Sequence, residues 1–385
     1  MFKSTLWRHV SYPIPTLANM TLQFGSDVNS LLNIVWLLSF FVFIVYGQRI
    51  QIYIVANDIS RALNRLKLMK DKSRKEAIDY FVGTGKTTAD PATKIDEFLE
   101  YVTIMPVDLD PQGIVGKIEH ITQTRDERVR SEVKRILPSA EQVKVSVAEN
   151  ILEIASSLNM IHKIVRHYYL LGKKTNSYIL LVQLQMIMPQ VLLEADALIN
   201  AVDTFKLGQP VGDGIGPIIA SKYMLNLPKQ TVAKDTVMSV TEYKGRTLYV
   251  LKAEGPMGYV GEPGIAIQKV IEEMNVPLNA IIMVDAALKL EGEKTGDVAE
   301  GIGAAIGGIG TDKFRIEDVS SKHKVPVYAI LVKQSILEAI TVMRKEITDA
   351  SDKVHTLIAN LIEEQTKEGD KILLAGIGNS LGVGQ

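Results

Sequence analysis

The stretch AIIMVDA at residues 280–286 places five apolar residues in a row ahead of one carboxylate, Asp285. A short apolar run of this kind is typical of a strand that is covered on both faces of a sheet. In open α/β sheets, ligands bind at the carboxyl ends of such strands. A carboxylate is costly to bury at this position unless it is paired or used, so Asp285 is a candidate functional residue.

Strand-like runs of similar composition recur through the C-terminal half of the chain, at 236–243, 246–253, 325–332 and 371–377. Helical patterns separate several of them, notably at 264–274 and 334–364. Strands that alternate with helices predict a mostly parallel sheet with both faces covered. We therefore expect an α/β domain of the phosphorylase/hydrolase-like kind over 208–385.

The preceding residues, 91–207, have a helical pattern throughout and predict an all-helical domain. The expected helices lie at 114–136, 145–171 and 177–205. Pro189 is expected to kink the third helix, because proline removes a backbone hydrogen bond. Before this domain, apolar residues at spacings of three and four predict a juxtamembrane amphipathic helix within 49–90.

The most apolar stretch is LLNIVWLLSFFVFIVY at 31–46, and it predicts a transmembrane helix over 31–48. Basic residues are concentrated after this stretch rather than before it. By the positive-inside rule, the N-terminal segment 1–30 is expected outside and the C-terminal body in the cytoplasm, as a single-pass protein of the cell membrane. Met20 is an alternative start to Met1.

A second hydrophobic segment, at 178–202, carries several polar and charged residues and one proline. Unpaired polar groups are costly in lipid, so this segment predicts a buried helix rather than a second span.

The composition excludes several classes of function. The 385 residues include 43 Lys plus Arg and 44 Asp plus Glu, a net charge of −1 that gives no field for attracting nucleic acid. The chain has no cysteine, which excludes disulfides, thiolate metal sites and a cysteine nucleophile. Oxygen, imidazole and amine chemistry remains.

Two glycine-rich segments border expected helices and strands. The segment VGDGIGPIIASKYM (211–224) is a turn that runs into a helix and carries Gly212, Asp213, Gly214 and Gly216. Its free N–H groups favour an anion, whereas the simpler interpretation is that Asp213 caps the helix. The segment ILLAGIGNSLG (372–382) is a strand that leads into Gly376, Gly378 and Asn379.

A third glycine-rich segment, GDVAEGIGAAIGGIG at 296–310, includes Gly307 and Gly308 and predicts a flexible loop that can approach a ligand closely. Together with the two segments above and Asp285, it predicts one shared cleft at the edge of the sheet.

These motifs resemble those of the spore germination protease and the hydrogenase maturation endopeptidases, which share one α/β fold. The resemblance rests on GIGN (376–379), the D-x-x-G-P turn and the strand ending in D-A. It implies that Asp213 and Asp285 carry peptide hydrolysis on a protein or peptide substrate. It also implies a divalent metal as a possible cofactor, held by Asp213, Asp285 and His323. In those families GIGN precedes the aspartate turn, so its C-terminal place here implies a circular permutation.

The chain as a whole also resembles an uncharacterised archaeal family of membrane-anchored proteins, which implies an architecture and no activity. Two hypotheses follow. In the first, the protein is an aspartate-dependent hydrolase, metal-assisted or metal-free, with one carboxylate ionised and the other protonated. In the second, it is a catalytically inactive, membrane-tethered scaffold or ligand-binding module, and its long helices form a homo-oligomer.

Overall fold

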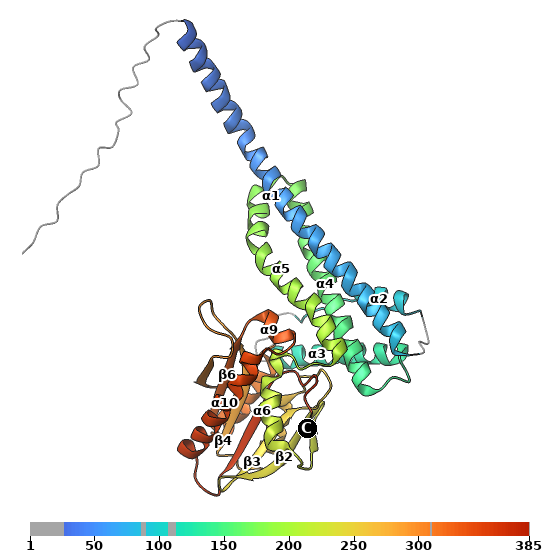
Figure 1. Ribbon diagram of the computed structural model, residues 1–385, viewed down its shortest axis with the longest axis vertical. Helices are drawn as coiled ribbons and strands as arrows, with labels where there is room; N and C mark the ends of the chain where they lie inside the picture. Colours follow the sequence, from blue (N-terminus) through green and yellow to red (C-terminus); the bar gives the residue numbers. More distant parts are fainter. Residues whose placement is uncertain (1–26, 86–89, 107–112, 309, 385) are drawn as a thin grey trace, which may run out of the picture.

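The structure, a computed structural model, describes residues 27–85, 90–106, 113–308 and 310–384 (Figure 1). Its N-terminal part is helical and its C-terminal part is a mixed α/β sheet domain. Residues 1–26 of the segment expected outside the membrane lie outside the described residues.

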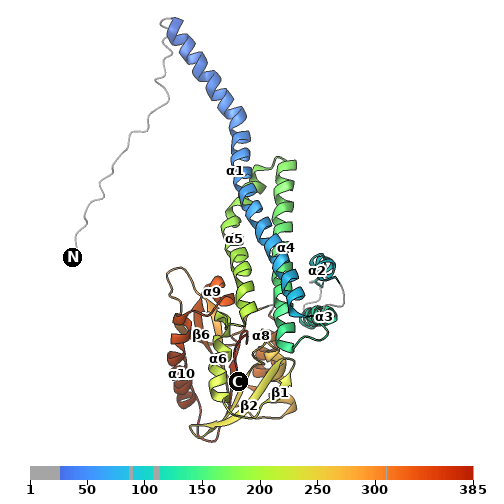
Figure 2. The same ribbon diagram turned by 45° about the vertical axis from the view of Figure 1, so that its right-hand side comes forward.

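The helical part consists of α1 (Asp27–Thr84), α2 (Pro91–Leu99), α3 (Ile114–Ile136), α4 (Gln142–Lys174) and α5 (Tyr178–Leu207). The lower part of α1 packs side by side with α4 and α5 around a shared apolar core (Figures 1 and 2). Helix α5 ends where Gly208 adopts a left-handed conformation with φ 61°, which glycine reaches without strain.

The first half of α1 projects beyond the tip of the α4–α5 hairpin in both views (Figures 1 and 2). Its apolar segment Leu31–Phe43 is exposed. This segment is shorter than the roughly 20 apolar residues that a membrane-spanning helix usually has. Among the described helices, α5 alone is long and apolar enough to cross one by length and composition.

The expectation that α5 is a buried helix needs correction, because only 22% of its most apolar window is buried. One face, with Leu181 and Leu184, packs into the helical core, whereas Met186 and Ile187 on the other face are 75% and 53% exposed. Contact with α1 and α4 covers one side of α5 and leaves the opposite side open.

The sheet has seven strands in the order β1-β2-β3-β7-β4-β6-β5. The strands are β1 (Gln230–Ala233), β2 (Thr236–Tyr243), β3 (Arg246–Ala253), β4 (Ala280–Leu288), β5 (Val298–Ile302), β6 (Val327–Gln334) and β7 (Lys371–Gly376). Strands β3, β7, β4 and β6 are mutually parallel, whereas β1, β2 and β5 are antiparallel to their neighbours. The sheet is therefore mixed rather than mostly parallel.

A short hairpin explains part of this difference. The turn between β2 and β3 contains Lys244 and Gly245, both at positive φ (48° and 74°), which is the geometry of a two-residue hairpin. Such a turn leaves no room for a crossover helix, so the two strands pair antiparallel. Strand β5 lies inside the segment expected to be a flexible loop, so that expectation is wrong for 298–302.

Helices cover both faces of the sheet. The helices α6 (Ile215–Met224) and α10 (Lys345–Gln365) cover one face, and α7 (Pro263–Gln268), with the π-helical turn η3 (Lys269–Glu273), and α8 (Thr311–His323) cover the other. The short α9 (Ile336–Ile340) follows β6 and packs against α5. Because α9 follows the carboxyl end of β6 and packs against α5, the carboxyl ends of the mutually parallel strands lie on the side of the sheet domain that faces the helical part (Figure 1).

Candidate functional site

Asp213 lies in a single 3-10 turn, η2 (Gly212–Gly214), between the end of α5 and the start of α6. It accepts a hydrogen bond from the backbone N–H of Asn379, with an N to Oδ2 distance of 2.8 Å. Neither this turn nor α6 receives a side-chain cap from Asp213. The simple helix-cap interpretation therefore fails, and the carboxylate instead faces the turn that follows β7.

Asp285 lies near the carboxyl end of β4, with 6% of its surface exposed. Its Oδ1 accepts a hydrogen bond of 2.7 Å from the N–H of Ala286. The backbone of Gly307, in the glycine-rich segment after β5, also stabilises the ionised form of this carboxyl group. Four separate parts of the chain thus meet around the two aspartates: η2, β4, the segment with Gly307 and the turn with Asn379.

Glycine is required at this junction because the backbones touch. A Cβ on Gly378 would lie 1.9 Å from the carbonyl oxygen of Asp213, and the residue has φ 127°. A Cβ on Gly216 would lie 2.2 Å from the carbonyl oxygen of Ile377, and one on Gly376 would lie 2.3 Å from that of Gly216. Any larger residue would push the turn after β7 away from Asp213.

The remaining glycines named from the sequence divide into two groups. Gly212 and Gly214 are also packed, since a Cβ on them would meet the carbonyl oxygens of Glu338 at 2.2 Å and Asn379 at 2.8 Å. Gly308 has φ 89° and open space around it, so its role is conformational rather than steric. The sequence motifs at 211–224, 280–286 and 372–382 therefore meet at one edge of the sheet, as expected.

The two carboxyl groups interact electrostatically. Burial and, to a smaller extent, the nearby charge of Asp213 together raise the pKa of Asp285 to about 8. Burial also raises the pKa of Asp213, whereas the N–H of Asn379 opposes this rise. A pKa of about 8 keeps Asp285 mostly protonated at neutral pH.

His323 does not join the aspartates. It ends α8, four residues before β6 begins at Val327, which pairs with Ile281 near the start of β4. It therefore lies at the opposite end of the sheet from Asp285, with its Nε2 3.7 Å from Glu272. Within the described residues no group of three or more His, Asp or Glu side chains could hold a metal ion, so the expected three-ligand site does not fit.

Two family models match consecutive parts of this chain. A protein of unknown function (DUF1512) N-terminal domain matches residues 33–208, and a domain of unknown function (DUF1512) C-terminal matches residues 211–384. The chain belongs to the DUF1512 family. No curated protein matches it. In this DUF1512 chain the two matched regions correspond to the helical part and the sheet domain, with the aspartates in the second.

Sequence reasoning missed a buried lysine at the same edge of the DUF1512 sheet. Lys252 in β3 is fully buried, lies opposite Gly376 of β7 in register, and donates a 3.0 Å hydrogen bond to the carbonyl of Ala253. Burial lowers its pKa to about 8. The pattern that identified Asp285, one charged residue near the end of an apolar strand, is also present in RTLYVLKA (246–253).

The sequence reasoning also missed a buried amide. Gln334 ends β6 with 1% of its surface exposed, and neither its nitrogen nor its oxygen has a hydrogen-bond partner among the described residues. A Cβ on Gly212 would lie 2.5 Å from its Oε1, so this amide borders the turn that carries Asp213.

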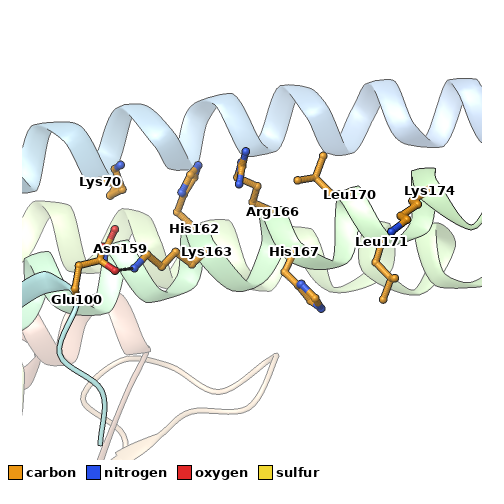
Figure 3. Close-up of a pocket in the computed structure, with 10 residues that line it drawn as sticks. All are labelled: Lys70, Glu100, Asn159, His162, Lys163, Arg166, His167, Leu170, Leu171 and Lys174. Atoms are coloured by element: carbon orange, nitrogen blue, oxygen red, sulfur yellow. Dashed lines mark hydrogen bonds and ion pairs between the residues drawn. The ribbon is translucent and has the colours of Figure 1, made fainter.

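A separate basic groove lies in the helical part of the DUF1512 chain, between α1 and α4 (Figure 3). His162 and Arg166 of α4 point toward α1 near Lys70, whereas Lys163 pairs with Glu100 (Figure 3). Burial and the neighbouring cations lower the pKa of His162. The groove, of about 580 Å³, offers positive charge to an anion, and it shares no lining residue with the aspartate pair.

Proposed function

We propose that this DUF1512 protein is a membrane-tethered peptide hydrolase in which Asp213 and Asp285 carry the reaction. The observation that supports the proposal is the meeting of two coupled carboxyl groups at the carboxyl edge of a sheet. Paired carboxyl groups with separated pKa values are the usual arrangement for acid and base catalysis by aspartates.

The proposed reaction uses the two groups in opposite protonation states. Ionised Asp213 accepts a proton from water as the water oxygen bonds to the carbonyl carbon of the peptide. Protonated Asp285 gives its proton to the departing amine nitrogen as the carbon–nitrogen bond breaks, and the proton on Asp213 then returns to Asp285 through solvent. Among the described residues no third His, Asp or Glu joins the pair, so the proposed steps use the two carboxyl groups alone.

The resemblance to the germination protease and the maturation endopeptidases belongs to this proposal. GIGN follows the other motifs in the chain, yet Asn379 lies against Asp213 through its backbone N–H. Such a juxtaposition is what a circularly permuted relative would have, because permutation changes the order of segments and keeps their contacts.

The hydrolase proposal is tested with the full chain and a mixture of internally quenched peptides. We expect the Asp285→Asn and Asp213→Asn variants to lose all cleavage, whereas Asp349→Asn, on the exposed face of α10, keeps the activity of the wild type. Cleavage that persists in both active-site variants would refute the proposal.

We also propose that residues 31–48 anchor the chain in a membrane, with the body on the cytoplasmic side. Supporting this, the exposed apolar part of α1 projects beyond the α4–α5 hairpin (Figure 2), and Arg49 and Tyr53 follow it. Arginine and tyrosine are common at the membrane surface.

The chain has no cysteine, so one introduced cysteine reports the topology. In intact cells that express the protein, an impermeant maleimide should label Ser4→Cys and leave Glu291→Cys, in the body, unlabelled until the cells are opened. Labelling of Glu291→Cys in intact cells would overturn this orientation.

An oligomeric scaffold is the second candidate function, and the open face of α5 favours it. Ile179, Met186 and Ile187 on this face are 69%, 75% and 53% exposed, and exposed apolar residues that lie together can mark an interaction site. Light scattering in mild detergent distinguishes the cases. A homo-oligomer that Met186→Glu dissociates supports the scaffold, and a monodisperse monomer counts against it.

A further inference from the structure

A polar cavity of about 280 Å³ lies between the helical part and the sheet domain. Helices α3 and α4 line one side, and the β1–β2 turn, the segment after β3 and Asn379 line the other. Direct contacts join the two sides: the N–H of Gly258 donates to Ser146 Oγ at 2.9 Å, and Asn150 Nδ2 donates to the Gly258 carbonyl at 3.1 Å. The cavity is thus formed by both matched regions of the family.

The charges that line this cavity are unbalanced. Five lining residues are acidic and two are basic: Asp126, Glu149, Glu153, Asp235 and Glu262, against Arg130 and Lys234. Arg130 already pairs with Asp235, with an Nη2 to Oδ2 distance of 2.6 Å. Arg125, just outside the lining, pairs with Glu153 at 2.6 Å and lies 4.0 Å from Asp126. With Arg125 included, five carboxyl groups face three cations, so the walls still carry more carboxyl groups than cations.

Two buried polar atoms in the lining residues have no hydrogen-bond partner among the described residues. These are Oε1 of Glu149 and the hydroxyl of Tyr259, in side chains that are 8% and 9% exposed. The nearest cation to Glu149 is Arg130, whose Nε lies 3.6 Å away and whose guanidinium stacks 4.5 Å from the Tyr259 ring centre. Burial raises the pKa of Glu149 to about 7, whereas Arg130 and the neighbouring Tyr259 hydroxyl favour its ionised form without making a well-formed hydrogen bond to Oε1. Buried polar atoms normally have partners, so a ligand is the natural source of one here.

The cavity is connected to the aspartate pair through one residue. Asn379 lines the cavity, and its backbone N–H donates to Asp213. The next residue, Ser380, fixes this turn to the same wall, because its N–H donates to the carbonyl of Tyr259 at 2.9 Å. A group held in the cavity would lie on the far side of Asn379 from Asp213.

We propose that this interdomain cavity binds a positively charged group of a peptide, and that Glu149 is its principal contact. The volume suits one extended side chain rather than a larger ligand. An amine or guanidinium would supply the missing hydrogen-bond donors to Glu149 Oε1 and the Tyr259 hydroxyl, and would balance the excess of carboxylates. This proposal rests on the proposed function, in which the substrate is a peptide. It specifies in addition that the preferred peptides carry a positively charged group.

Binding is measured by calorimetry on the full chain in detergent. The probes are acetylated, amidated pentapeptides, Gly-Gly-X-Gly-Gly, in which X is lysine, norleucine or glutamate, and the norleucine peptide with a free amino terminus. We expect the lysine peptide to bind at least about tenfold more tightly than the acetylated norleucine and glutamate peptides. Tighter binding of the free-amino norleucine peptide than of the lysine peptide would identify the amino terminus as the recognised cation.

The variants separate this proposal from the hydrolase proposal. Glu149→Gln should weaken binding of the preferred cationic peptide about tenfold, and Asp126→Asn provides a second test if Glu149→Gln does not fold. Asp349→Asn, on the exposed face of α10 and outside the cavity lining, should bind as the wild type does. Equal binding of all four peptides, or unchanged binding in the folded Glu149 variant, would overturn the proposal. Cation binding without cleavage would leave the cavity assignment standing and refute only the hydrolase.

Discussion

Replacing Asp285 with asparagine should remove hydrolysis and, at neutral pH, stabilise the sheet domain. The folded protein holds the Asp285 proton more tightly than the unfolded chain does, because burial and Asp213 raise its pKa from 3.8 to about 8. Between these two values the folded state binds more protons, so the stability of the wild type falls as the pH rises. Above pH 8 the loss is complete, and below pH 4 it is absent.

The size of the effect follows from the two pKa values. Each pH unit in this interval changes the free energy of unfolding by about 1.4 kcal/mol, so the loss between pH 4 and pH 7 is about 4 kcal/mol. Asparagine does not titrate and has nearly the same shape as a protonated aspartate. The Asp285→Asn variant should therefore match the wild type at pH 4 and exceed it at pH 7 by a few kcal/mol, less any hydrogen bond that the amide does not reproduce.

Hydrogen exchange of peptides from β4 and β7 measures this directly, because their amides exchange only when the sheet opens. After correction for the intrinsic pH dependence of exchange, the protection of wild-type β4 should decrease from pH 5 to pH 8. Protection in Asp285→Asn should depend much less on pH. Parallel pH profiles for the two proteins would show that Asp285 titrates normally in the fold and would refute the reasoning.

Three further changes test the packing around the site. Gly378→Ala places a Cβ against the carbonyl of Asp213 in a backbone conformation that is unfavourable to alanine. This variant should impair catalysis and lower the free energy of unfolding by about 3 kcal/mol or more. A change of less than about 1 kcal/mol in urea unfolding would contradict this expectation. Lys252→Met should stabilise the protein at pH 7 by up to about 3 kcal/mol. Burial lowers the pKa of Lys252 from 10.5 to about 8, so the cost of the buried lysine is fully present below pH 8 and is lost as the pH rises to about 10.5. A lower thermal midpoint for this variant would mean that the ammonium group is needed. Ser335→Ala removes the side-chain cap of α9 and should lower the free energy of unfolding by about 1 kcal/mol. Differential scanning calorimetry measures this loss, with Ser221→Ala on α6 as the control. An equal loss of stability in both variants would contradict the expectation.

The sequence was sufficient for the main strands and long helices because each carries a continuous apolar pattern. The expected helix at 114–136 is α3, and the runs at 236–243 and 246–253 are β2 and β3 with the same limits. The expected helix at 334–364 is instead interrupted, since 341–344 form an extended connection between α9 and α10. Strands β1 and β5 were not predicted from the sequence, because they are short edge strands and their pairing depends on their neighbours in the sheet.

The residues of the candidate site likewise divide into those that the sequence could identify and those that it could not. Asp213, Asp285 and Asn379 could be selected from the sequence because each stands at the junction of an apolar segment and a glycine turn. His323 could not be excluded in that way, since its distance from Asp285 depends on the direction in which α8 crosses the sheet. No sequence pattern identified Glu149 as a candidate residue. The residues around it in the sheet domain reach it only because α4 packs on the segment after β3.

The most direct test of the paired carboxyl groups is a carbon-13 NMR titration of the aspartate carboxyl carbons in the full chain. The resonance missing from the spectrum of Asp285→Asn identifies Asp285. We expect this group to titrate near pH 8 in the wild type and at a lower pH in Asp213→Asn, where the repelling charge is gone. A wild-type value near 4, or a raised value that does not change in Asp213→Asn, would contradict the account.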